Sequence, residues 1–196
     1  MKELKVRIEF IEPILGSSSG NPDIHREFIA SKAPDAPKRE EEVEALGVDA
    51  VEKKEMTVFP RTADGKPCLW DYQVRGFFKH ACSMLKNVKG TNSSAIKAYK
   101  KYIDGLVFVN ERKIPLEFEG EIGNCQRPLR GQTAHGERIA LANSEMCPAG
   151  TAAEFTVVCL QDELIGAVKE WLNYGKLNGL GQWHNSGMGR FAWAER

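Results

Sequence analysis

Two side chains near the N-terminus could take part in proton transfer. His25 and Asp23 follow residues 13–20, a stretch rich in serine and glycine that predicts a loop. An imidazole titrates near neutral pH and can accept or donate a proton, and a carboxylate can serve as a base. Neither residue is anchored in a periodic segment, so a surface loop without catalytic function is the simpler interpretation.

The cysteines do not form a recognisable metal site. Their number is odd, and no two of them have the short spacing of a zinc-binding pair. We therefore predict reduced, buried thiols and neither a metal nor another cofactor. The cysteines are Cys68, Cys82, Cys125, Cys147 and Cys159.

The most distinctive motif lies at residues 179–189 and is called the glycine loop below. Two doublets, Gly179 with Gly181 and Gly187 with Gly189, each enclose one apolar residue. Glycine permits positive φ and close backbone approach, and successive amides in such a loop can bind an anion. A dinucleotide fingerprint would follow a strand and open a helix, whereas this loop follows a predicted helix. The motif predicts a contact with phosphate or with another packed loop.

Two side chains inside the glycine loop could contribute to binding. Trp183 could stack on a nucleobase, although an aromatic that anchors the loop is an alternative. His184 is the other candidate, although a histidine is a weaker phosphate ligand at neutral pH than a lysine or an arginine.

Positive charge is concentrated in the middle of a chain whose net charge is zero. Residues 75–138 contain 12 Lys and Arg against 6 Asp and Glu, whereas residues 1–74 and 139–196 are both net acidic. A basic section of this kind is a candidate contact for a polyanion. A lysine-rich, solvated helix surface would explain the same distribution.

Five basic residues in this section are candidate phosphate ligands. Arg75 and Lys79 lie one turn apart in a predicted helix, and the alternative is a solvated helix face. Arg127, Arg130 and Arg138 lie in a glycine-containing segment that predicts irregular structure. The planar arginine fork matches phosphate geometry, and the alternative for this segment is a mobile surface loop.

Hydrophobic periodicity predicts strands and helices in alternation. Leu4, Val6, Ile8 and Phe10 alternate with polar residues, as in a half-buried strand. Apolar residues three and four apart predict a helix over 71–86. The remaining predicted elements are helices at 94–102 and 162–177, strands at 106–109 and 114–122 joined by a turn at 110–113, and strands at 154–160 and 190–193.

This order favours an α+β fold, with helices on one face of an antiparallel sheet. We expect a single domain over residues 1–196, with a charged insertion at about 21–56 that protrudes from the core. The sequence contains no apolar run of 18 residues, so we expect no membrane-spanning helix and a cytoplasmic location.

Taken with its surroundings, the glycine loop resembles that of the RAMP superfamily, the repeat-associated proteins of CRISPR systems. Residues 6–20 and 59–79 are similar to the first strand, loop and helix of the backbone subunits in type III effector complexes. Residues 144–151 are similar to the segment that enters their penultimate strand. Members of the superfamily usually open that helix with small residues, whereas this chain has Trp70-Asp71-Tyr72.

The resemblance implies a ferredoxin-like, RRM-related fold that holds single-stranded RNA by its phosphate backbone. Arg75 and Lys79 would face the RNA, and partners would include CRISPR effector subunits or further copies of this chain. A stand-alone or phage-encoded member, in antiviral defence or against it, is equally compatible.

Two other functions remain open. A metal-independent endoribonuclease would use His25 or Asp23 to activate the 2′-hydroxyl. A phage inhibitor that mimics a CRISPR backbone subunit would bind a protein and no RNA. The first would cleave RNA in EDTA, and the second would form a stable complex with a host partner.

Overall fold

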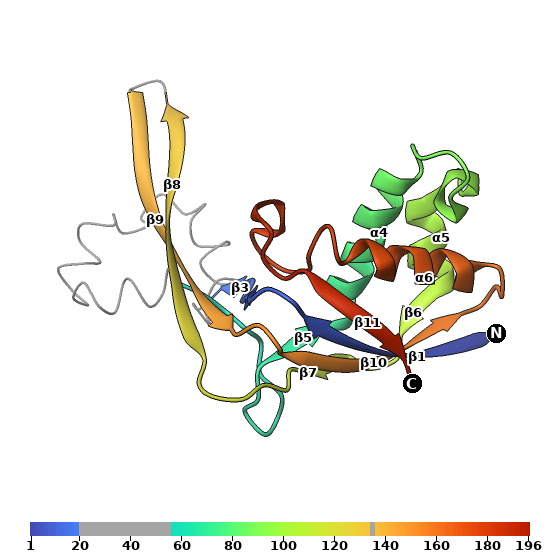
Figure 1. The fold of residues 1–196 in the computed structure, drawn as a ribbon, viewed down its shortest axis with the longest axis horizontal. Helices are drawn as coiled ribbons and strands as arrows, with labels where there is room; N and C mark the ends of the chain where they lie inside the picture. The colour runs from blue at the N-terminus through green and yellow to red at the C-terminus, as the bar shows by residue number, and fades with distance from the viewer. Residues whose placement is uncertain (20–55, 134–135) are drawn as a thin grey trace, which may run out of the picture. The chain divides into compact units, whose positions relative to one another are not determined.

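The computed structural model describes residues 1–19, 56–133 and 136–196 (Figure 1). Almost all of the predicted insertion, with His25 and Asp23, lies outside these residues. The chain divides into two compact units. The first contains Met1–Ile14, Pro60–Glu121 and Cys147–Arg196, and the second contains Leu15–Phe59 and Ile122–Met146.

An antiparallel sheet forms the base of the first unit. Within the described residues it has four strands in the order β11-β1-β10-β6. The central pair runs in register from Lys2↔Cys159 to Glu9↔Ala152. The predicted antiparallel sheet is therefore confirmed, and in it the first strand pairs with the strand that contains Glu154. The strands are β1 (Lys2–Phe10), β6 (Val107–Val109), β10 (Ala152–Cys159) and β11 (Phe191–Glu195).

The helices of this unit lie on one face of that sheet (Figure 1). They are α4 (Asp71–Leu85), α5 (Tyr99–Leu106) and α6 (Leu164–Tyr174). Helix α4 connects β1 with β6, and α6 connects β10 with β11, which makes the split βαβ arrangement of a ferredoxin-like fold. The α+β fold class predicted from the sequence is confirmed.

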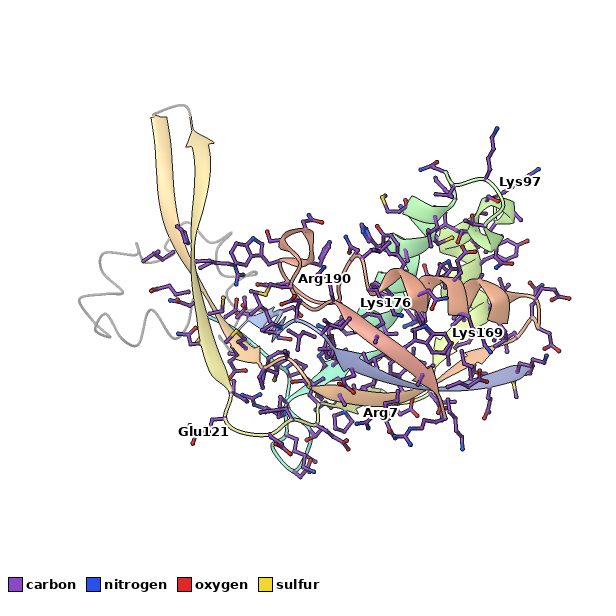
Figure 2. The ribbon with its side chains drawn as sticks, viewed as in Figure 1. Arg7, Lys97, Glu121, Lys169, Lys176 and Arg190 are labelled. Carbon is purple, nitrogen blue, oxygen red and sulfur yellow. The ribbon has the colours of Figure 1, made fainter. Side chains whose placement is uncertain are left out.

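Alternating side chains of the sheet form the core against these helices. The apolar residues of β1 predicted to share a face, from Leu4 to Phe10, are all buried. Phe78 of α4 packs on Trp171 of α6 with ring centroids 5.6 Å apart. On the opposite face, Arg7 donates a 2.9 Å hydrogen bond to Glu154 (Figure 2). The two-residue period of the strands therefore separates an apolar face from a charged one.

A long hairpin dominates the second unit. Strands β8 (Gly123–Thr133) and β9 (Gly136–Cys147) pair antiparallel from Gly123↔Met146 to Thr133↔Gly136. The prediction of irregular structure for the segment that contains Arg127, Arg130 and Arg138 was wrong. Its glycines and proline suggested a loop, but cross-strand pairing satisfies its backbone hydrogen bonds. The sheet order is β2-β9-β4-β3, where the short strands are β2 (Ile14–Leu15), β3 (Ser18–Ser19) and β4 (Thr57–Val58).

The predicted turn at residues 110–113 does not join two paired strands. Strand β6 pairs with β10, whereas β7 (Lys113–Pro115) pairs with β5 (Cys68–Trp70). The strand predicted at 114–122 is observed as β7, which ends at Pro115 because its partner β5 is equally short. The lysine-rich helix begins at Tyr99, later than predicted, after the 3₁₀ helix η1 (Asn92–Ala95). None of the helices in the described ranges combines the length and apolarity needed to cross a bilayer.

Candidate functional site

Direct backbone contact closes the glycine loop. A Cβ atom on Gly179 would lie 2.1 Å from the carbonyl oxygen of Met188, and one on Gly189 would lie 2.0 Å from that of Leu180. The Leu180 amide donates to the Gly189 carbonyl at 2.9 Å, and the Gly189 amide donates to the Pro13 carbonyl at 2.9 Å. Side chains at the outer glycine of each doublet would push the two ends of the loop apart, so this spacing of glycines is required by packing.

The tip of the loop is tightly wound around the short 3₁₀ helix η2 (His184–Ser186). Gly181 and Gly187 have φ of 93° and 90°. Among the residues described, Trp183 is the only non-glycine with positive φ, at 58°. This left-handed conformation costs energy for a bulky residue, and it leaves the indole 38% exposed.

Several backbone amides of the glycine loop already donate hydrogen bonds within the protein. The amides of Leu180, Ser186, Gly187, Met188 and Gly189 all donate to backbone carbonyls. These groups are not available to an anion, so a phosphate at the loop would be bound by the remaining amides or by side chains.

The glycine loop packs against α4 through a pair of histidines. The rings of His80 and His184 meet edge to face, with centroids 5.4 Å apart. Nδ1 of His184 lies 3.1 Å from the carbonyl oxygen of Gly181, which favours the tautomer with a proton on Nδ1. Burial, together with the neighbouring His184, lowers the pKa of His80 below its ordinary value of 6.5. The glycine loop therefore lies beside the helix that begins at Asp71.

Two of the predicted basic ligands, Arg75 and Lys79, lie on α4, and each has an acidic partner. Arg75 forms an ion pair with Asp71 at 3.3 Å, one turn earlier in the helix. Lys79 forms an ion pair with Asp104 of α5. Between them on the same face, a Cβ at Gly76 would meet no described atom within 4 Å. The face is open to a ligand, and its positive charge is partly neutralised by these carboxylates.

An aromatic cluster at the start of α4 was not predicted from the sequence. Trp70 and Tyr72 are nearly parallel, with an interplanar angle of 16° and ring centroids 6.1 Å apart. The guanidinium carbon of Arg112 lies 5.0 Å from the Trp70 ring centroid and 5.7 Å from that of Tyr72. The Lys113 ammonium lies 5.0 Å from the Trp70 centroid. The aromatic residues at the helix start were a visible signal, but their basic neighbours come from a strand some 40 residues later.

The three arginines of the second unit lie on the hairpin. Arg127 is buried, with 6% of its surface exposed. Arg130 pairs across the hairpin with Ile139, and Arg138 pairs with Gly131, near the end of the ladder. The side chains of residues 129–140 lie outside the described part of the structure, as do those of His25 and Asp23.

The thiols and the other potential metal ligands do not cluster. Within the described residues, no group of three His, Cys, Asp or Glu side chains could hold a metal ion. Four of the five cysteines are buried, and Cys125 is partly exposed. Burial raises the pKa of Cys159 to about 11, so this thiol is protonated at neutral pH.

Comparison with known proteins gives a match at the level of structure. No protein-family model matches the sequence, and the search of curated proteins gave no match. A chain of a type IV-B CRISPR complex aligns with all of this chain and with 90% of its own length, at a TM-score of 0.52 and 11% identity. A chain of the type III-B Cmr-beta complex bound to cognate target RNA also aligns with all of this chain, at a TM-score of 0.50 and 11% identity.

This chain spans 59% of the type III-B chain. At such low identity the similarity concerns the fold, and it leaves the residues of any site to be argued from their own chemistry. The protein therefore has a fold that occurs in CRISPR effector complexes.

Proposed function

We propose that this protein binds single-stranded RNA through its phosphate backbone, as a CRISPR-related or phage-encoded protein of the RAMP type. The observation that carries the proposal is the closed glycine loop beside α4, where His184 packs on His80. The loop belongs to the unit with the ferredoxin-like sheet. The support for the proposal from comparison is a fold shared with a chain of the type III-B Cmr-beta complex, which is bound to cognate target RNA. CRISPR effector subunits and further copies of this chain are the partners that such a role implies.

The proposed path of the phosphates runs along the exposed face of α4. Arg75 and Lys79 are one turn apart, and Gly76 leaves the helix surface between them uncovered by the described atoms. The ion pair between Lys79 and Asp104 is partly exposed and contributes little net stability, so a phosphate could replace Asp104 at small cost. Asp71 is buried, so Arg75 would keep that ion pair and attract the phosphate through its charge. Arg130 and Arg138 of the hairpin, and the glycine loop with Trp183, are proposed as further contacts. Arg127 is buried, so a contact between its side chain and RNA would require that side chain to move.

Titration of labelled single-stranded RNA at increasing salt tests this function. Because phosphate contacts release counterions, the logarithm of affinity should fall linearly with the logarithm of salt concentration. Combining Arg75→Ala with Lys79→Ala should reduce both the affinity and the salt slope, the latter by about 1.4 for the loss of two phosphate contacts to a single strand. EDTA in the buffer and a gel of the recovered RNA would show whether it stays intact.

Lys169 provides a matched control for this experiment. It lies on α6 and forms an ion pair with Glu195, with an exposure similar to that of Lys79. Lys169→Ala should leave RNA affinity unchanged. Affinity that is the same at low and high salt would contradict the proposed function, and equal losses in the control and test variants would contradict its location on α4.

A further inference from the structure

The pairing of β5 with β7 builds a surface at the N-terminus of α4 from distant parts of the sequence. Trp70 lies directly opposite Lys113 in the antiparallel ladder. The next residue, Asp71, donates its amide to the carbonyl of Arg112 at 3.2 Å, and its carboxylate binds the Arg112 side chain. Two basic side chains are thereby held beside the rings of Trp70 and Tyr72.

The cluster is positioned in advance of any ligand. The Asp71 carboxylate is shared by Arg75 and Arg112, so the guanidinium groups are oriented while the local charge remains positive. The Lys113 ammonium donates to the Arg61 carbonyl at 2.5 Å, which restrains a long side chain. Fixing these groups in the free protein lowers the entropic cost of binding.

Exposure distinguishes these rings from core aromatics. Tyr72 is 49% exposed, and the Arg112 side chain is 67% exposed. In contrast, the α4 aromatics Phe77 and Phe78 are buried against the sheet and α6. Tyr72 is the exposed member of this nearly parallel pair of rings, and Trp70 is partly buried beside the cations. The pair can accept one more planar group on the exposed side, at Tyr72.

We propose that Trp70, Tyr72 and Arg112 form a stacking site for an unpaired nucleobase of single-stranded RNA. This inference rests on the proposed function and adds recognition of bases to it. A base provides the planar π-face that the rings accept, and its phosphates complement the adjacent cations. A duplex is excluded as the ligand, because its bases are already stacked on each other.

The stacking site is continuous with the proposed phosphate path. Tyr72, Arg75 and Lys79 are three and four positions apart on α4, which places them on the same side of the helix. About 10 Å along the helix axis separates Tyr72 from Lys79. A strand whose base stacks at Tyr72 would therefore carry its next phosphates past Arg75 and Lys79. The site discriminates between polyanions that have bases and polyanions that lack them.

Substitution of Tyr72 tests the site with two RNA probes of equal length, one of uridines and one with abasic nucleotides. The wild type should bind the uridine strand about tenfold more tightly than the abasic strand. Tyr72→Leu should abolish this preference without weakening binding to the abasic strand, whereas Tyr72→Trp should keep it. Tyr102→Leu is the control, because Tyr102 is a tyrosine on α5 with a comparable exposure of 41%.

The possible outcomes separate this inference from the function on which it rests. Salt-dependent binding with equal affinity for the two strands would overturn the stacking site alone, and it would leave the rings available to a protein partner. A preference for bases that survives in Tyr72→Leu would do the same. Absence of RNA binding in a folded wild type would overturn both proposals.

Discussion

Among single residues, His80 connects the chemistry of the site to its stability. Its Nε2 atom is buried and has no hydrogen-bond partner within the described residues. Protonation of His80 at Nε2 would add an N–H group and a positive charge at this buried position, beside the ring of His184. The lowered pKa of His80 therefore has a structural cause in burial and in the neighbouring imidazole.

The free energy of unfolding should fall as the pH decreases through 6.5. Because the pKa of His80 is lower in the folded chain, the unfolded chain binds a proton that the folded chain resists. The stabilisation is complete above pH 6.5 and is lost between that pH and the lower folded-state pKa. Urea midpoints measured from pH 8 to pH 5 should show a smaller decrease in His184→Gln, which lacks one of the two causes.

His80→Gln is the reference for this measurement, because it removes the titrating group itself. The difference between wild type and His80→Gln isolates the one residue. Identical pH profiles for these two proteins would contradict the proposed coupling.

Close packing in the glycine loop predicts that alanine lowers the free energy of unfolding more at Gly189 than at Gly120, a glycine outside the loop. Gly189→Ala places a methyl group against the Leu180 carbonyl at a φ of 66°, so we expect a loss of about 3 kcal/mol in the free energy of unfolding. Gly120→Ala has a comparable φ of 91°, but no described atom lies within 4 Å. The control should therefore lose only about 1 kcal/mol. Equal losses in urea denaturation would show that backbone strain, and not close packing, explains the motif.

At the scale of elements, α4 is central because it belongs to the core and to the proposed site at once. Its buried face carries Val74, Phe77, Phe78 and Ala81, and the opposite face carries the proposed ligands. The apolar period of the helix thus determines which basic residues are exposed. Helix α5 modifies this face through the ion pair between Asp104 and Lys79.

Removing the acidic partner of Lys79 should strengthen RNA binding. In Asp104→Asn, Lys79 no longer has a competing carboxylate, so we expect a several-fold increase in affinity at low salt. The increase should shrink at high salt, where exposed charges are screened. Glu195→Gln, which releases Lys169 in the same way, is the control. A gain of equal size in both variants would indicate a general effect of net charge.

At the scale of the whole molecule, the fold and the side chains carry different information. The similarity to chains of CRISPR complexes extends over the whole chain, at 11% identity. At such identity it concerns the fold and not the residues of a site. The function therefore has to be argued from side chains, such as the aromatic cluster and the pair formed by His80 and His184.

The sequence alone determined the features that follow a local rule. Alternation from Leu4 to Phe10 predicted a half-buried strand, and apolar spacing predicted α4 to within one residue of its end. The glycine doublets marked a closely packed loop after a helix. Each of these follows from the geometry of a few neighbouring residues, because strand and helix periods repeat within ten or fifteen positions.

Only the tertiary structure decided which distant residues meet. Trp70 and Lys113 are 43 positions apart, and His80 and His184 are 104 apart, so no local period relates them. The same holds for β6, which pairs with β10 and not with the strand that follows the predicted turn at 110–113. Such contacts depend on backbone hydrogen bonds and apolar surfaces across the whole chain, which is why the aromatic cluster emerged only after folding.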